Sequence, residues 1–302
     1  MDLSLLQRRI FKDKAARWVM LALTGLSLFL LIAIGIGLFF KSRLILSEHS
    51  LWDLLSGSSW KPLSGEFGFL PFIVGTLFVT ALSIAIALPI SLLSAIFLTE
   101  YANSWVKRVV FPIFDILAGI PSVVYGVWGT LIIVPWIADK LGPHFVDYTS
   151  GYTVLASGIV LGIMILPILV SLLIEIFTIV PQDYREASAS LGATKWQTCS
   201  KVILRKAMPG IVAAVVLSIS KAFGETIAVL MVCGNYAAIP RSLFDPCYPL
   251  PALIANNYGE MLSLPLYESA LMFAAFILFF IILIFNIISR WILRNIERSY
   301  KM

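Results

Sequence analysis

Six long apolar stretches, separated by shorter polar segments, dominate the pattern of residues along the chain. They cover residues 18–40, 71–98, 109–137, 153–177, 209–233 and 269–292. An α-helix rises about 1.5 Å per residue, so each stretch is long enough to cross a hydrocarbon layer about 30 Å thick. The pattern therefore predicts an all-α integral membrane protein with six transmembrane helices.

The composition supports this class of protein. Of the 302 residues, 60% are hydrophobic and 13% are charged, and the mean hydropathy is +0.95. Soluble domains carry about 25% charged residues, and a water-soluble fold cannot hide this much apolar surface. The first stretch is too long for a signal-peptide core, so we expect it to be retained. Because the loops hold no soluble domain, any energy source is expected to be a partner protein or an ion gradient.

The basic residues predict the orientation. Sixteen Lys and Arg residues lie on the side that holds both termini, five lie on the other side, and Lys221 lies inside a stretch. Segments rich in Lys and Arg stay in the cytoplasm, so both termini are expected there. The chain then divides into five segments. They are a cytoplasmic N-terminus (residues 1–17), a first transmembrane helix (18–40), an external loop (41–70), a five-helix core (71–292) and a cytoplasmic tail (293–302).

The core contains one long cytoplasmic loop, residues 178–208, whose pattern predicts two short helices. Ala187 and Leu191 favour the first helix, Gly192 ends it, and Thr194 can cap the second. Two interpretations fit this hairpin. It can lie on the lipid headgroups as an amphipathic element, or its small residues can let another protein approach closely and push on it.

Two charged residues lie well inside the fifth stretch. Lys221 is about 18 Å from Pro209 along a helix, near the middle of the membrane, and Glu225 follows four residues later. We expect the two side chains to share one helix face. They either fix packing between helices as a buried pair, or line a polar pathway, as buried charges in membrane helices usually do.

The third stretch contains helix-weakening residues in its middle. Gly119 and Pro121 interrupt the backbone ladder, and such a break survives only against protein or water. Ser122 and Tyr125 add hydroxyl groups beside it. The alternatives are a kink with tight glycine packing and a helix break where hydroxyl groups contact a solute.

Cysteine and histidine usage predicts no metal site and no cofactor. The chain has three cysteines and two histidines, without metal-ligand spacing. Cys233 and Cys247 both fall near the external face, and the sequence leaves open whether they form a disulfide.

The cytoplasmic loop resembles a known family motif. Glu186-Ala-Ser-x-x-Leu-Gly-Ala is similar to the EAA loop of ABC-importer permeases, with Ser188 and Arg205 where that motif usually has Ala and Pro. The resemblance implies that the first helix of the loop docks in a groove of an ATP-binding subunit. The residues that carry this implied coupling role are Glu186, Ala187, Leu191 and Gly192.

Further stretches resemble phosphate-importer permeases of the PstC type. Lys221-Ala-Phe-Gly-Glu-Thr-Ile-Ala-Val is similar to a family stretch that begins with Arg, and Leu117-Ala-Gly-Ile-Pro-Ser-Val-Val-Tyr-Gly is similar to another. The resemblance covers the chain from about Phe67 to its C-terminus. It implies a translocation pathway for inorganic phosphate along Lys221, Glu225, Thr226, Ser122 and Tyr125.

The resemblance also implies an assembly. We expect the type I ABC importer permease fold in a prokaryotic inner membrane, in contact with lipid. The expected partners are a second, PstA-like permease subunit, two cytoplasmic ATP-binding subunits and an extracytoplasmic phosphate-binding protein. The chain itself is then no enzyme, and no nucleic acid is expected among its partners.

Other functions are weighed against this one. A permease for another oxyanion, such as sulfate or molybdate, keeps the class and changes the cargo. A proton-coupled secondary transporter with Glu225 as proton carrier changes the class and needs no ATP. A membrane-embedded enzyme is disfavoured because the sequence holds no nucleophile–base or metal-ligand cluster.

Overall fold

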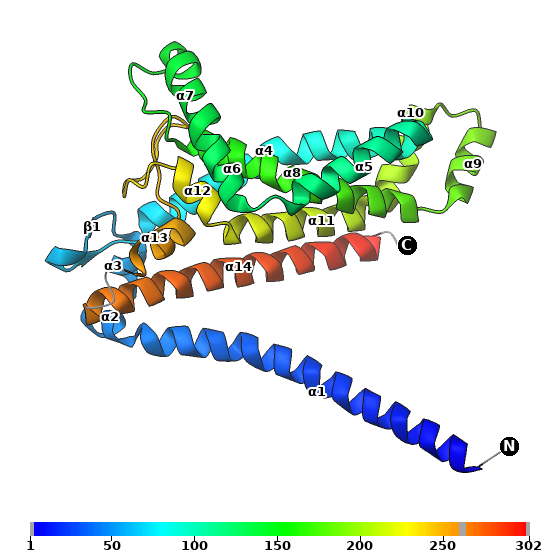
Figure 1. Cartoon of the computed structure of the whole chain (residues 1–302), viewed down its shortest axis with the longest axis horizontal. Helices are drawn as coiled ribbons and strands as arrows, with labels where there is room; N and C mark the ends of the chain where they lie inside the picture. Colours follow the sequence, from blue (N-terminus) through cyan, green and yellow to red (C-terminus); the bar gives the residue numbers. More distant parts are fainter. Residues whose placement is uncertain (1–2, 260–263, 300–302) are drawn as a thin grey trace.

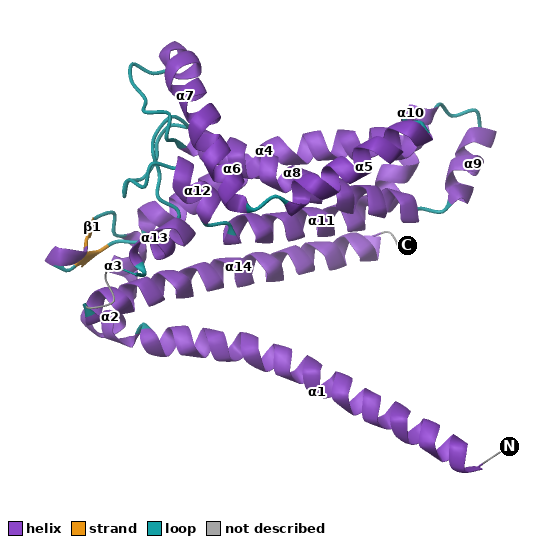
Figure 2. Ribbon diagram, viewed as in Figure 1, coloured by secondary structure: helices purple, strands orange, loops and turns teal. Residues whose placement is uncertain are grey.

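The computed structural model describes residues 3–259 and 264–299, which are mostly helical (Figure 2). Its helices and strands are α1 (Leu3–Lys41), α2 (Arg43–Glu48), α3 (Leu51–Ser56), β1 (Trp60–Lys61), β2 (Glu66–Phe67), α4 (Leu70–Ile96), α5 (Ser104–Gly119), α6 (Ser122–Trp128), α7 (Val134–Trp136), α8 (Val154–Ile179), α9 (Gln182–Ser190), α10 (Lys195–Thr198), α11 (Leu204–Gly224), α12 (Ile227–Val232), α13 (Leu250–Asn257) and α14 (Pro265–Ser299). Helical turns of other types prolong several of them, chiefly η2 (Phe97–Tyr101), η3 (Gly129–Ile133), η4 (Ile137–Leu141) and η6 (Cys199–Ile203).

Within the described residues, six helical runs are long and apolar enough to cross a membrane, as the sequence predicted. They are Lys12–Lys41, Leu70–Tyr101, Ser122–His144, Val154–Ile179, Lys195–Gly224 and Pro265–Asn295. The first helix already begins at Leu3, and α14 continues to Ser299. The predicted N-terminal segment and tail are therefore largely helical extensions of the outer spans, and residues 300–302 lie outside the described residues.

The third span differs from the prediction of one helix over residues 109–137. Helix α5 ends at Gly119, Ile120 and Pro121 are extended with ψ of 128° and 143°, and α6 starts the membrane-spanning run at Ser122. Proline has no backbone N–H and disfavours helical backbone in the residue before it. The break therefore falls at this dipeptide, and the span shifts toward His144.

The fifth span also differs from the prediction, which placed it over residues 209–233. The helical run begins at Lys195 and ends at Gly224, so Pro209 lies inside α11. Glu225 is extended, with ψ of 128°, and the short helix α12 follows. The predicted segment is thus two helices with a non-helical joint between them.

Helices α4 and α8 form the centre of the bundle, where they pack against each other. Lipid tails are as apolar as leucine, so such packing depends on close approach rather than on expulsion of water. Gly158 and Gly162 of α8 allow this close approach of the two helices. A Cβ at Gly158 would overlap Leu82, and a Cβ at Gly162 would lie 3.2 Å from the Ser83 carbonyl oxygen. The glycine spacing of four residues places both on one helix face.

The remaining long helices lie outside this pair. Helix α11 packs against α8 and α14, whereas α1 contacts α14 near its own C-terminal end and then diverges from the bundle (Figure 1). The start of α1, the end of α14 and the α9–α10 hairpin all lie at one end of the molecule. Strand β1, α7 and α13 lie at the other end. We call these the hairpin end and the opposite end.

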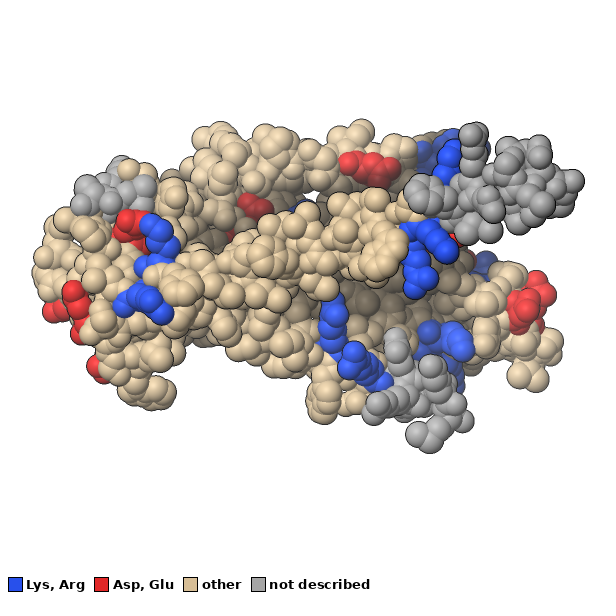
Figure 3. All heavy atoms as spheres, turned by 90° about the horizontal axis from the view of Figure 1, so that it is seen from below, with Lys and Arg blue, Asp and Glu red and all other residues tan. Residues whose placement is uncertain are grey.

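Aromatic side chains of the segment 41–70 pack together at the opposite end, and Phe72 of α4 joins them. Strands β1 and β2 form an antiparallel pair, with Trp60 opposite Phe67. The Trp60 ring contacts the rings of Phe69 and Phe72 with centroid distances of 5.3 and 5.0 Å. Charged side chains gather mainly toward the two ends of the surface seen in Figure 3, and most of the band between them is uncharged. This distribution matches a band that faces lipid.

Candidate coupling hairpin and membrane pathway

The hairpin at 178–208 has the two helices and the glycine turn that its sequence predicts. Helix α9 is followed by Gly192 with φ of +78°, a backbone region that glycine enters without steric strain. Thr194 then accepts a hydrogen bond from the Gln197 N–H at 3.3 Å, and the Gln197 side chain accepts one from the Thr194 N–H at 2.9 Å. This capping box starts α10, which continues through η6 into α11.

The tip of the hairpin is exposed. None of the described residues of α9 is buried, and Leu191 is 88% exposed. Glu186 and Ala187 are also exposed. Beyond its chain neighbours, no described atom lies within 4 Å of a Cβ built on Gly192. The four residues with an implied coupling role therefore form an unobstructed surface that another molecule can approach.

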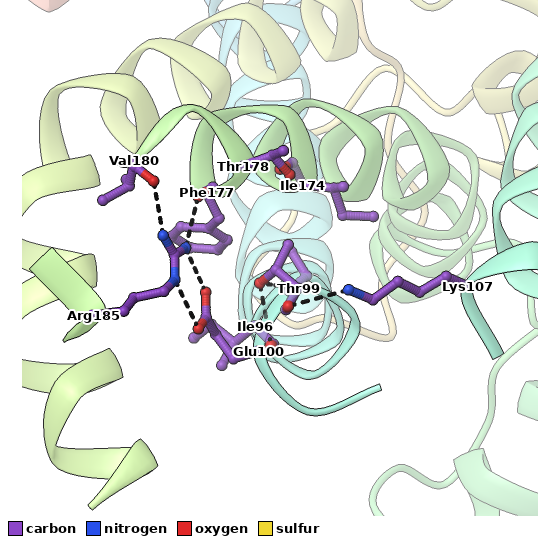
Figure 4. Close-up of polar contacts among 10 residues, drawn as sticks. Ile96, Thr99, Glu100, Lys107, Ile174, Phe177, Thr178, Val180 and Arg185 are labelled. Carbon is purple, nitrogen blue, oxygen red and sulfur yellow. Dashed lines mark hydrogen bonds and ion pairs between the residues drawn. The ribbon is translucent and has the colours of Figure 1, made fainter. Parts of the chain in front are cut away.

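An arginine side chain fixes the base of the hairpin to the second span (Figure 4). Arg185 of α9 donates from Nη2 to Glu100 Oε1 at 2.8 Å and from Nε to Glu100 Oε2 at 3.2 Å. Glu100 belongs to η2, which prolongs α4. This is a bidentate, charge-assisted contact, the strongest type of side-chain hydrogen bonding. The two side chains are only 19% and 13% exposed, so water screens the pair weakly.

The same guanidinium group reaches the end of the fourth span. Its Nη1 donates to the Val180 carbonyl oxygen at 2.7 Å, and its Nη2 donates to the Phe177 carbonyl oxygen at 3.1 Å. These carbonyls belong to the last turn of α8 and its C-cap, which have no partner inside the helix. A positive charge at a helix C-terminus is also favoured by the helix dipole. We call Arg185, Glu100 and these two carbonyl groups the arginine clamp.

Smaller contacts hold the rest of the hairpin. The hydroxyl groups of Ser188 in α9 and Thr198 in α10 are 2.8 Å apart and hydrogen-bonded. Lys107 of α5 donates to the Thr99 carbonyl oxygen at 3.3 Å, beside the clamp (Figure 4). The hairpin base is therefore joined to the ends of α4 and α8, α5 is joined to the end of α4, and the tip of the hairpin is exposed.

The helix break in the third span joins Tyr125 to the preceding helix. The Tyr125 hydroxyl donates to the Leu117 carbonyl oxygen at 2.8 Å, and the side chain is 6% exposed. Gly119 and Pro121 are exposed, and Ser122 is half-buried. The Tyr125 hydroxyl thus donates its hydrogen to a carbonyl across the break, which leaves its lone pairs for a solute, and its contact with a solute stays a prediction.

The two charges of the fifth span do not share a helix face, contrary to the prediction. Lys221 is exposed in the last turn of α11, where the helix dipole favours a cation. Glu225 follows the end of that helix, and its Oε1 accepts a hydrogen bond from the Ala228 N–H at 3.4 Å in the first turn of α12. Among the described residues neither side chain forms an ion pair with the other.

The two breaks lie on helices that pack together. Helix α12 contacts α6, and at Gly126 an added Cβ would overlap the Met231 side chain. Thr130 of the same run donates to the Met231 carbonyl oxygen at 3.1 Å. Glu225 and Thr226, which precede α12, are half-buried. Two interrupted helices held side by side are a common framework for solute sites in membrane transporters.

Sequence reasoning did not identify the arginine clamp. Arg185 was counted only as a basic loop residue, and Glu100 was not singled out. The sequence held one signal for this pair. Glu100 is a carboxylate directly after the second apolar stretch, and a charged side chain at the end of a membrane span needs an oppositely charged partner. Among the described residues, no group of three or more His, Cys, Asp and Glu side chains is arranged to hold a metal ion.

Comparisons with known proteins agree with this architecture. Residues 87–302 match the family model described as binding-protein-dependent transport system inner membrane component. A probable ABC transporter permease protein, YqgH of Bacillus subtilis, is 40% identical over 79% of this chain and 78% of its own length. The phosphate transport system permease protein PstC of Pasteurella multocida is 36% identical over 82% of this chain and 81% of its own.

A solved structure shares the fold. A chain of the MetNI methionine ABC transporter, in an inward-facing conformation, superimposes with a TM-score of 0.58 at 19% identity. The match covers 79% of this chain and 99% of that one. This chain therefore has the fold of an ABC importer permease and belongs to the family of binding-protein-dependent transport system inner membrane components.

Proposed function

We propose that this chain is the PstC-like permease subunit of an ABC importer that takes up inorganic phosphate. The observation that carries the proposal is the α9–α10 hairpin, which has a free tip and a base clamped to two membrane-spanning helices. Such an element transmits movement of a docked protein to the spans. The relatives named as PstC and the matching stretch from Lys221 to Val229 support phosphate as the cargo.

The hairpin is proposed as the docking site for a cytoplasmic ATP-binding subunit. Leu191 provides an exposed apolar contact, Ala187 leaves room for a groove wall, and Glu186 adds a charge. The competing interpretation places this hairpin on lipid headgroups. A surface helix of that kind needs no rigid attachment to other spans, whereas Arg185 binds α9 firmly to α4 and α8.

A second, PstA-like permease subunit is proposed to cover the face that carries the pathway residues. Lys221 is exposed although it lies within a membrane-spanning run, and an unpaired ammonium facing lipid costs about 2.5–3.5 kcal/mol on insertion scales. A water-filled pathway between two permeases removes that penalty. Lys221, Glu225, Thr226 and Ser122 would then border the route of the anion, with an extracytoplasmic phosphate-binding protein at the opposite end.

Reconstitution tests the proposal. The chain is incorporated into liposomes with its cognate second permease and ATP-binding subunit, and uptake of radiolabelled phosphate is followed after addition of the binding protein. We expect uptake that requires ATP and the binding protein and is not reduced by excess sulfate. Uptake driven by a proton gradient without ATP would support a secondary transporter, and competition by sulfate or molybdate would assign another oxyanion.

A further inference from the structure

Two buried thiols lie next to each other at the end of the molecule opposite the hairpin. Cys233 caps the C-terminus of α12, and Cys247 lies in the loop that leads to α13. Both residues are 0% exposed, and both carry free thiols. The Cys247 N–H donates to the Cys233 carbonyl oxygen at 2.9 Å, and Cys247 forms a parallel bridge with Gly234. The backbones at the two cysteines are therefore in direct contact.

This contact places the two residues within reach of a disulfide bond. With standard bond lengths, a hydrogen bond of 2.9 Å limits the separation of the two Cα atoms to about 6.8 Å. Disulfides join residues whose Cα atoms are about 4.4–6.8 Å apart. The neighbouring Cys233 thiol, together with burial, raises the pKa of the Cys247 thiol well above its ordinary value.

We propose that Cys233 and Cys247 form an intramolecular disulfide bond on the extracytoplasmic side of the membrane. This inference rests on the orientation in the proposed function, which places the opposite end of the molecule outside the cytoplasm. Disulfides form and persist in that compartment, whereas cytoplasmic thiols are kept reduced. Cys199, at the hairpin end, is then expected to stay a free thiol.

The chemistry is thiol–disulfide exchange with an external disulfide, either a small molecule or an oxidised dithiol protein. The thiolate of one cysteine attacks the oxidant and releases one of its sulfurs as a thiol. The second cysteine then displaces the other sulfur, which closes the Cys233–Cys247 bond. The two cysteines lose two protons and two electrons, and the oxidant gains both. Because the folded thiols are buried, this exchange takes place before the loop closes over them.

The bond would join α12 to an anchored loop. Residues 234–249 are held against the start of α8, where Val154 and Leu155 donate backbone N–H groups to the Asp245 and Leu243 carbonyl oxygens, each at 2.9 Å. Helix α12 has non-helical joints at both ends, at Glu225–Thr226 and at Gly234, where φ is +86°. A disulfide at Cys233 immobilises the joint at Gly234. Helix α12 can then move only about the joint at Glu225–Thr226.

Differential alkylation tests the inference in the assembled importer. Membranes are denatured without reductant in light N-ethylmaleimide, then reduced and treated with the heavy reagent, and peptides are identified by mass spectrometry. We expect light label on Cys199 and heavy label on Cys233 and Cys247, with a linked peptide joining these two before reduction. Light label on both Cys233 and Cys247, or a link from Cys199 to either, overturns the inference.

A Cys247→Ser variant is the matched control. In this variant we expect Cys233 to carry the light label instead of the heavy one, while Cys199 keeps the light label. Heavy label that persists on Cys233 would contradict Cys247 as its disulfide partner. The result is separable from the proposed function. Light label on both cysteines in an importer with ATP-dependent phosphate uptake would refute only the disulfide. A disulfide in a complex without such uptake would refute only the proposed function.

Discussion

Arg185 forms four hydrogen bonds through one planar group, two to Glu100 and two to carbonyl oxygens at the end of α8. A guanidinium group presents several donors in a fixed plane, so a single side chain can join three segments of chain. Lysine keeps the charge but concentrates it at one atom and cannot reproduce this geometry. Removal of one partner from a buried pair destabilises by about 3 kcal/mol or more, and the low exposure of this pair places it near that figure.

We predict that Arg185→Lys lowers phosphate uptake about tenfold, which corresponds to about 1.4 kcal/mol, while ATP hydrolysis by the complex persists. The hairpin base then moves without moving α4 and α8. The measurement is phosphate transported per ATP hydrolysed in proteoliposomes. Arg205→Lys is the matched control, because Arg205 is exposed on α11. Equal coupling ratios in the two variants would show that the clamp does not transmit movement.

Glu225 is predicted to support α12 rather than to carry protons. In Glu225→Gln the amide oxygen still accepts the Ala228 N–H, so ATP-driven phosphate uptake should stay near the wild-type rate and sulfate should not compete. In Glu225→Ala this hydrogen bond is lost, which should lower stability by about 1 kcal/mol in thermal unfolding. Loss of uptake in the Gln variant at normal expression would favour the proton-carrier function, and sulfate competition in it would make Glu225 a selectivity residue.

At the scale of elements, the hairpin combines a rigid base with a turn that only certain residues tolerate. Gly192 has φ of +78° and open space around its Cβ position, so a side chain there meets no neighbour but strains the backbone. For residues other than glycine this region costs about 1–2 kcal/mol, and asparagine tolerates it better than β-branched residues. The angle between α9 and α10 therefore depends on this position.

Gly192→Val is predicted to uncouple ATP hydrolysis from phosphate uptake without loss of membrane insertion, and Gly192→Asn should restore much of the coupling. Uptake and ATP hydrolysis are measured on the same preparation. The control is Gly25→Val in α1, where the space is also open but φ is not positive. If Gly192→Val transports normally at normal expression, the hairpin is not the docking element.

At the scale of the whole molecule, the long helices run between two chemically different ends. The hairpin end holds the start of α1, the end of α14 and most of the basic residues of the loops, and the opposite end holds the aromatic cluster around Trp60 (Figures 1 and 3). By the positive-inside rule, the hairpin end is predicted to lie in the cytoplasm. The proposed docking site for an ATP-binding subunit, the start of α1 and the end of α14 then share one compartment.

Introduced cysteines test this orientation. We predict that Leu191→Cys, at a position 88% exposed, reacts with an impermeant maleimide only from the cytoplasmic side, in inverted vesicles stripped of the ATP-binding subunit. Tyr148→Cys, at a position 86% exposed near the opposite end, should react only from outside. The unmodified chain is the control, because its native cysteines are buried. Reaction of the Leu191→Cys variant from outside would reverse the proposed topology.

The sequence by itself determined the features that depend on neighbouring residues. Hydropathy gave the six spans, and the residues of the hairpin gave both its helices, the cap at Thr194 and the turn at Gly192, because caps, turns and helix propensity act over a few positions. Gly119 and Pro121 also indicated the break at which α5 ends, whereas hydropathy did not locate the end of α11, because an apolar stretch looks the same whether its helix is continuous or broken.

Only the tertiary structure decided which distant groups meet. Arg185 and Glu100 are 85 positions apart, and nothing local to either residue specifies the other. Cys233 meets Cys247 only because the loop between them folds back onto the start of α8. Lys221 and Glu225 are close in the sequence but do not meet. A spacing of four residues predicts contact only in a continuous helix, and this helix ends at Gly224. Whether two of these groups meet depends on helix packing and on the path of the chain between them. The number of residues that separates two groups in the sequence does not by itself predict their contact.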